Sequence, residues 1–117
     1  MLLALVIGRS ALAAGPSPRA MDQLASDKGC YLCHRVKPVK PKGEALLPYA
    51  PSWADIAKKY KGQRDAENRL TQIVLGGSDP TDRHWQGKVS DIMLPTVKEI
   101  DEDEARQLVH WILSFAR

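Results

Sequence analysis

Hydrophobic residues recur at helical spacing in four stretches of the chain, and no stretch alternates for long enough to predict a β-strand. We expect helices over about 19–28, from 52 to 61, over about 65–75 and from 101 to the end. The last is the clearest, because its apolar residues recur every three or four positions: Ala105, Leu108, Val109, Ile112 and Phe115. The pattern predicts one all-α domain of about four helices.

Capping residues support these boundaries. Ser52 with Asp55, and Asp101 with Glu104, have the three-residue spacing of a capping box, in which two side chains satisfy the free amides at the start of a helix. Glycines follow the first three predicted helices and are expected to end them: Gly29, Gly62, Gly76 and Gly77.

Two long loops separate these helices, over 35–51 and 78–100. The first contains four prolines, which exclude a helix or a central strand: Pro38, Pro41, Pro48 and Pro51. Loops of this length are unusual in so small a domain unless they have a function or wrap a bound group. We therefore expect both loops to cover a bound group.

The first 14 residues form a unit of their own, an apolar run followed by Ala11-Leu12-Ala13, a small-residue cleavage pattern. We interpret 1–14 as a signal peptide and 15–117 as the folded domain, which predicts export. No basic residue precedes the apolar run, so a start upstream of Met1 and an uncleaved tether stay open as alternatives. No later stretch approaches the roughly 20 apolar residues of a membrane span.

The chemistry-bearing motif is Cys30-Tyr31-Leu32-Cys33-His34, the C-x-x-C-H signature of covalent haem attachment. One turn presents both sulfurs to the haem vinyl groups, and the next residue can coordinate iron. The chain has only 2 cysteines, so a four-ligand zinc site lacks its second pair. A thioredoxin-like redox pair would need a strand before it. We therefore predict one haem c bound through Cys30 and Cys33, with His34 on the iron.

The other face of the iron has four candidate ligands: Met21, His84, Met93 and His110. Met93 is favoured, because it lies in the second loop and Pro95 stiffens its approach. His84, in the same loop, is its rival, whereas Met21 and His110 lie on predicted helices. An open iron site also remains.

The formal charge of +3 and the pI near 9.0 do not indicate nucleic-acid binding. Without Arg9 of the leader the chain has 16 basic and 14 acidic residues, or +2, and two haem propionates would nearly cancel this. No basic stripe with interleaved aromatic residues is present.

At three blocks the chain resembles the small bacterial class I c-type cytochromes. The blocks are Gly29–His34, Ala50–Tyr60, and Met93-Leu94-Pro95 followed by the helix with Trp111. The resemblance spans 20–117 and implies the class I cytochrome c fold, with one covalent haem under His34 and Met93 ligation. It also implies a periplasmic single-electron carrier rather than an enzyme; no residue is indicated as catalytic.

The resemblance also implies roles for four further residues. The Pro51 carbonyl would accept a hydrogen bond from the His34 ring, Trp53 would pack on the haem, and Trp111 would pack on the first helix near Gly29. Trp85 would bond a haem propionate, although simple core packing is an equal alternative. Longer spacings than in the shortest family members, over 37–47 and 86–92, weaken this last assignment.

Redox proteins are the expected partners, with the chain as a monomer or as a subunit of a heteromer. Five basic residues near the motif could steer acidic partners or simply be a solvated loop: Lys28, Arg35, Lys37, Lys40 and Lys42. Two other functions stay open: the cytochrome subunit of a periplasmic dehydrogenase or oxidase complex, and a small-ligand-binding haem domain with an open iron site.

Overall fold

The computed structural model describes residues 15–38, 47–90, 92–96 and 98–116. It contains four α-helices and two single 3₁₀ turns: α1 (Pro18–Asp27), η1 (Cys30–Leu32), α2 (Trp53–Tyr60), α3 (Ala66–Gly76), α4 (Glu102–Leu113) and η2 (Ser114–Ala116). No strand occurs among these described residues, so the predicted all-α class with four helices is confirmed. The predicted leader, 1–14, and the part of the first loop over 39–46 lie outside them.

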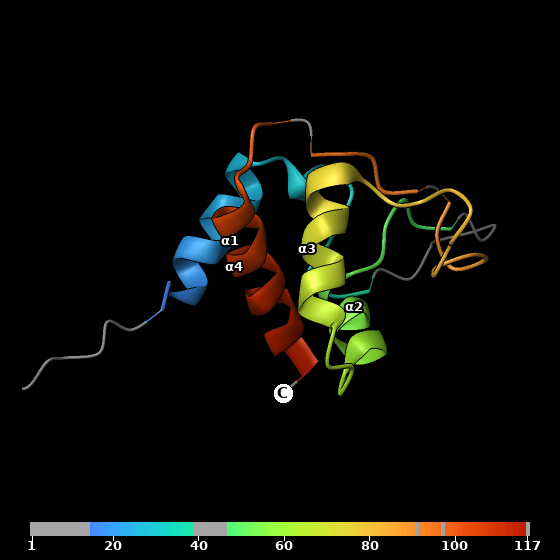
Figure 1. Cartoon of the computed structure of the whole chain (residues 1–117), viewed down its shortest axis with the longest axis horizontal. Coiled ribbons are helices and arrows are strands. Elements are labelled where there is room, and N and C mark those ends of the chain that lie inside the picture. Colours follow the sequence, from blue (N-terminus) through green and yellow to red (C-terminus); the bar gives the residue numbers. More distant parts are fainter. Residues whose placement is uncertain (1–14, 39–46, 91, 97, 117) are drawn as a thin grey trace, which may run out of the picture.

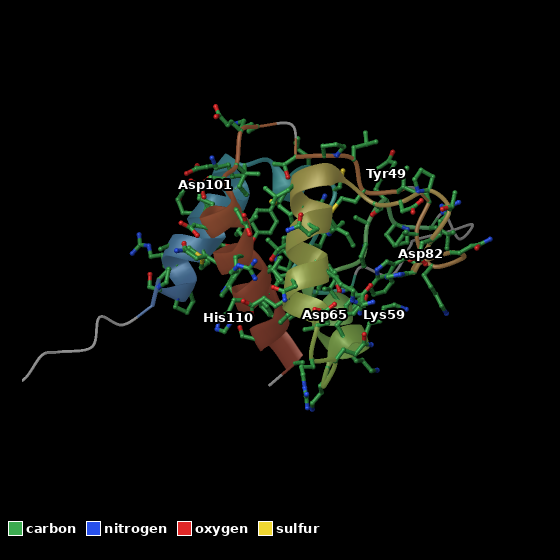
Figure 2. All side chains as sticks on the ribbon, in the orientation of Figure 1. Tyr49, Lys59, Asp65, Asp82, Asp101 and His110 are labelled. Atoms are coloured by element: carbon green, nitrogen blue, oxygen red, sulfur yellow. The ribbon has the colours of Figure 1, made fainter. Side chains whose placement is uncertain are left out.

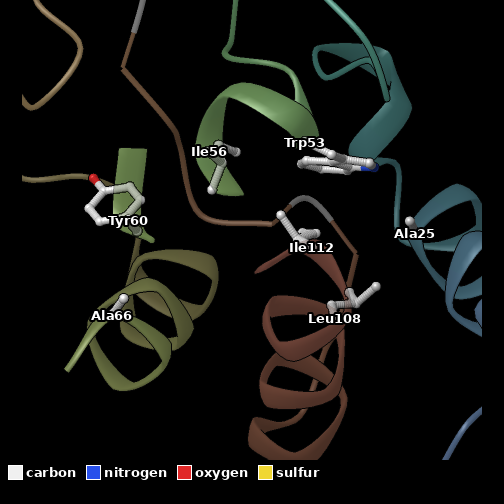
Figure 3. Close-up of a cluster of buried hydrophobic side chains, with 7 residues drawn as sticks. All are labelled: Ala25, Trp53, Ile56, Tyr60, Ala66, Leu108 and Ile112. Atoms are coloured by element: carbon white, nitrogen blue, oxygen red, sulfur yellow. The ribbon is translucent and has the colours of Figure 1, made fainter. Parts of the chain in front are cut away.

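Helix α4 is the centre of the domain, because it packs against α1, α2 and α3. Figure 1 shows α1 and α4 side by side although they lie at opposite ends of the chain, with α3 on the other side of α4. The apolar stripe predicted for the last helix is buried, with Leu108 and Val109 at most 2% exposed. One cluster links all four helices (Figure 3): Ala25, Trp53, Ile56, Tyr60, Ala66, Leu108 and Ile112.

Helices α2 and α4 begin where their capping residues predict. Asp101 accepts from the Glu104 amide at 2.8 Å, and Glu104 accepts from the Asp101 amide at 3.2 Å, which completes the predicted capping box. Ser52 accepts from the Asp55 amide at 3.1 Å. The second half of that box is different, because the Asp55 carboxylate accepts from the Ser52 hydroxyl at 3.0 Å instead of from the backbone.

Two predicted helix ends need a small correction. Helix α2 ends at Tyr60, not Lys61, because Lys61 already has an extended backbone (φ −54°, ψ 127°) before Gly62 turns the chain (φ +76°). Gly76 stays inside α3, and Gly77 ends that helix with a φ of +82°. Only a residue without a Cβ adopts that angle easily.

Trp111 lies on α4 with its ring edge-on to Phe115, 5.1 Å between centroids. It shares a surface depression with Pro18 and Met21. This places it beside the first turns of α1, whereas the resemblance implied a contact near Gly29 at the other end of that helix. None of the helices in the described ranges is long and apolar enough to cross a membrane.

Candidate haem site

Both cysteines and the following histidine lie on one tight turn. Gly29 leaves α1 in the left-handed conformation (φ +81°), which redirects the chain into η1. The turn closes where the Cys30 carbonyl accepts from the Cys33 and His34 amides, at 3.3 and 3.0 Å. Both thiols are free; Cys33 is exposed, whereas Cys30 is half-buried and burial raises the pKa of its thiol.

The His34 ring is held in one tautomer. Its side chain is buried, and its Nδ1 lies 2.7 Å from the Pro51 carbonyl oxygen, the contact that the resemblance implies. A carbonyl can only accept, so Nδ1 carries the proton and donates it. Burial lowers the pKa of His34, because it disfavours the charged ring, while the Pro51 contact opposes this. The neutral ring therefore presents an unprotonated Nε2, which is the form that binds a metal.

Trp53 packs against the face of this ring. Its indole is 2% exposed and stacks on the His34 imidazole, with 4.5 Å between centroids and 24° between planes. The indole is carried by the first turn of α2, which is fixed to the segment after His34. The Trp53 and Ala54 amides donate to the carbonyls of Arg35 and Val36, at 2.8 and 3.1 Å. His34 and its support thus form one unit.

A second contact on this side escaped the sequence analysis. Tyr31, inside the C-x-x-C-H motif, donates its hydroxyl to Asp22 on α1 and lies 3.5 Å from the Trp53 indole nitrogen. Its pKa is raised by burial and then by Asp22, because a carboxylate disfavours a phenolate next to it. The spacing of nine residues to Asp22 belongs to no standard pattern, so only the fold reveals the pair.

Met93, the predicted second ligand, is half-buried in the second loop. Its backbone is fixed to the end of α3, because the Met93 carbonyl accepts from the Ser78 amide at 2.7 Å. The next residue, Leu94, is 70% exposed. The segment is therefore held through its backbone and not by burial of Leu94.

The three rival ligands have other roles in the fold. His84 Nδ1 lies 2.8 Å from the Tyr60 hydroxyl, and its Nε2 lies 3.2 Å from Asp82. Met21 is buried in α1, 5% exposed. His110 is exposed on α4, with its Nδ1 3.1 Å from Glu67 (Figure 2).

Trp85 packs on the end of α2. Its ring is edge-on to Tyr60, 6.5 Å between centroids, and the Lys59 ammonium lies 4.9 Å above it. These contacts give Trp85 a packing and cation–π role whether or not it also meets a propionate. The basic residues near the motif are also partly engaged: Lys28 donates to the Glu99 carbonyl and lies 3.1 Å from Glu104, and Arg35 donates to the Tyr31 carbonyl. Lys40 and Lys42 lie outside the described residues.

The arrangement fits covalent haem c. Two free thiols share one turn, and the imidazole that follows them has its Nδ1 occupied and its Nε2 free. A helical domain with this site belongs to the class of small c-type haem proteins. In these, the thiols form thioethers and the histidine binds iron.

Comparison with known proteins agrees with this class. The chain belongs to the cytochrome c family, whose model matches residues 20–116. It is 38% identical to cytochrome c-552 of Hydrogenobacter thermophilus over 96 residues, 81% of each chain. It is 33% identical to cytochrome c-551 of Pseudomonas aeruginosa, over 97% of this chain and 93% of that protein. The crystal structure of Nitrosomonas europaea cytochrome c552 superimposes with a TM-score of 0.61 at 29% identity, covering 80% of this chain and 98% of that one.

Membership of the cytochrome c family defines the class of activity. The protein is an electron-transfer protein and not an enzyme, and it carries haem c bound covalently through its two cysteines. It works by exchanging electrons with redox partner proteins. The predicted class I fold and cofactor are confirmed.

Proposed function

We propose that the protein is a periplasmic single-electron carrier in which His34 and Met93 are the axial ligands of the haem iron. The observation that carries this proposal is the pair of contacts at the two residues. The Pro51 carbonyl fixes the His34 ring with Nε2 free, and the Ser78 amide fixes the Met93 backbone. Haem c supplies an iron that accepts and releases one electron.

The residues on the His34 side keep that ligand from moving during electron transfer. The Pro51 carbonyl raises the basicity of the imidazole by accepting a hydrogen bond from its Nδ1, and the Trp53 indole prevents the ring from tilting. A ligand held in this way changes position little between the two oxidation states. Pro51 and Trp53 are therefore assigned as positioning residues for His34.

Met93 is preferred over its rivals because each of them would have to give up a contact in order to bind iron. His84 would lose either the Tyr60 hydroxyl or Asp82, depending on the nitrogen that binds, and Met21 would leave the core. A methionine ligand favours a higher reduction potential than a second histidine, which suits a carrier. Trp85 is assigned to packing on Tyr60, with a propionate contact as an additional role.

The remaining part of the proposal concerns the compartment. Residues 1–14 are assigned as a signal peptide and 15–117 as the exported domain. The apolar run followed by small residues supports this, together with the free thiols that haem attachment needs. Mass spectrometry of the exported holoprotein tests the cleavage site and the haem content, since the expected mass is that of 15–117 plus one haem.

The ligand assignment is tested by Met93→Ala in the holoprotein. We expect loss of the weak near-red absorption band of oxidised methionine-ligated haem, a lower reduction potential, and rapid carbon monoxide binding to the reduced protein. Met21→Leu and His84→Gln are the matched controls, and both should keep the band. An unchanged band in Met93→Ala, or its loss in Met21→Leu alone, contradicts the assignment.

A further inference from the structure

The carboxyl end of α3 and residues 93–96 of the second loop form one joint. The Ser78 amide donates to the Met93 carbonyl at 2.7 Å, and the Thr96 hydroxyl donates to the Val74 carbonyl at 2.9 Å. Val74 is in the last turn of α3, where carbonyls have no partner within the helix. Two hydrogen bonds therefore anchor the loop on either side of Leu94 and Pro95.

Gly77 lies at the centre of this joint, and it leaves no room for a side chain. A Cβ built at Gly77 would lie 2.9 Å from Pro95 Cδ and 3.0 Å from both the Met93 carbonyl oxygen and the Pro95 nitrogen. Two of these three atoms belong to backbone, which cannot rotate away. The loop thus approaches α3 as closely as a hydrogen atom at Gly77 permits.

Two other glycines of the chain provide a comparison. Gly62 and Gly87 also have a positive φ, of +76° and +78°, but a Cβ at either would meet nothing within 4 Å. The backbone angle explains all three glycines. Only at Gly77 does close contact add a second reason.

This joint fixes the backbone from which the Met93 side chain extends. The carbonyl of Met93 is fixed, and Pro95 two residues later has a fixed φ and packs against Gly77. Since Leu94 is 70% exposed, side-chain burial at that position does not hold the segment. The direction in which the Met93 side chain leaves the loop is therefore set by contacts with the end of α3.

We propose that the end of α3, through Gly77 and Thr96, is the positioning element of the Met93 ligand. This inference rests on the proposed His34 and Met93 ligation. It assigns to α3 the role that Pro51 and Trp53 have for His34. Gly77 and Thr96 act through Met93 and do not touch the haem themselves in this assignment.

The test compares Gly77→Ala with Gly62→Ala in the holoprotein. Both variants place an alanine at a positive φ, but only Gly77→Ala drives a Cβ into the loop. We expect Gly77→Ala to lose much of the near-red methionine band when oxidised and to bind carbon monoxide faster than wild type when reduced. Gly62→Ala should keep the wild-type band and rate. Equal behaviour of the two variants would overturn the proposal.

Thr96 provides a milder pair of variants in case Gly77→Ala does not fold. Thr96→Val removes the donor to the Val74 carbonyl at nearly constant shape, and Thr96→Ser keeps it. Thr96→Val should show a weaker band and faster carbon monoxide binding, and Thr96→Ser should restore both. If the wild-type protein itself has no methionine band, the proposed ligation fails. If wild type has the band and all four variants keep it, only the positioning role of α3 fails.

Discussion

The two sides of the site are held in different ways. On the His34 side the ligand's own ring is fixed, by a hydrogen bond to Pro51 and by stacking on Trp53. On the Met93 side the support consists of backbone contacts, from Ser78 and from the close approach of Pro95 to Gly77. The His34 side depends on the C-x-x-C-H motif and on Pro51 and Trp53 at the start of α2. The Met93 side depends on how a long loop meets a distant helix, so a change far from Met93 in sequence can alter it.

The largest effect is expected from Trp53→Ala, which removes the support of the His34 ring. The indole is 2% exposed, and truncating a buried tryptophan costs about 3–5 kcal/mol because of lost burial and the cavity left behind. Chemical denaturation of the holoprotein measures this loss. Trp53→Phe, which keeps an aromatic ring beside His34, should lose much less. A loss in Trp53→Ala no larger than in Trp53→Phe would refute the support role.

A smaller effect is expected from Lys28→Met, which breaks the last anchor of the second loop. Lys28 bonds the Glu99 carbonyl and pairs with Glu104, so it joins the end of α1 to the loop just before α4. Its side chain is 20% exposed, and the loss should be about 1–2 kcal/mol. Lys61→Met, at an exposed position after α2, is the charge-matched control in the same denaturation experiment. Equal stability of the two variants would show that the anchor contributes nothing.

The smallest effect is expected from Tyr31→Phe. It removes one partly exposed hydrogen bond on the His34 side and should cost about 0.5–1.5 kcal/mol in the free energy of unfolding. Asp22→Asn tests the same pair through its charge. Because the Asp22 carboxylate raises the pKa of Tyr31, the substitution should lower that pKa in an alkaline titration of tyrosine absorbance. An unchanged titration would mean that the pair is not formed in solution.

Local features of the site were predictable, and long-range features were not. Cys30, Cys33 and His34 form a contiguous motif, and the caps at Ser52 and Asp101 act within one helical turn, so each is visible in a few letters. The hydrogen bond between His34 and Pro51 was expected only through the family resemblance, because 17 residues separate the two.

The contacts that escaped prediction join segments distant in sequence. Gly77 carries an obvious signal, since Gly76-Gly77 was expected to end a helix, but nothing in the letters shows that Pro95 packs against it. Lys28 was considered as part of a steering surface, and its bond to Glu99 crosses 71 residues. The glycine pair therefore predicted a helix end correctly and gave no hint of the joint formed there.

The packing of α1 on α4 joins the first and last α-helices of the described residues. Glu104 completes this closure, because the same carboxylate caps α4 and pairs with Lys28. Separating the two helices would open the stretch of chain that runs between them through α2 and α3, and closing it again would cost loop-closure entropy. Breaking the contact between α1 and α4 is therefore expected to lower the stability of the whole domain.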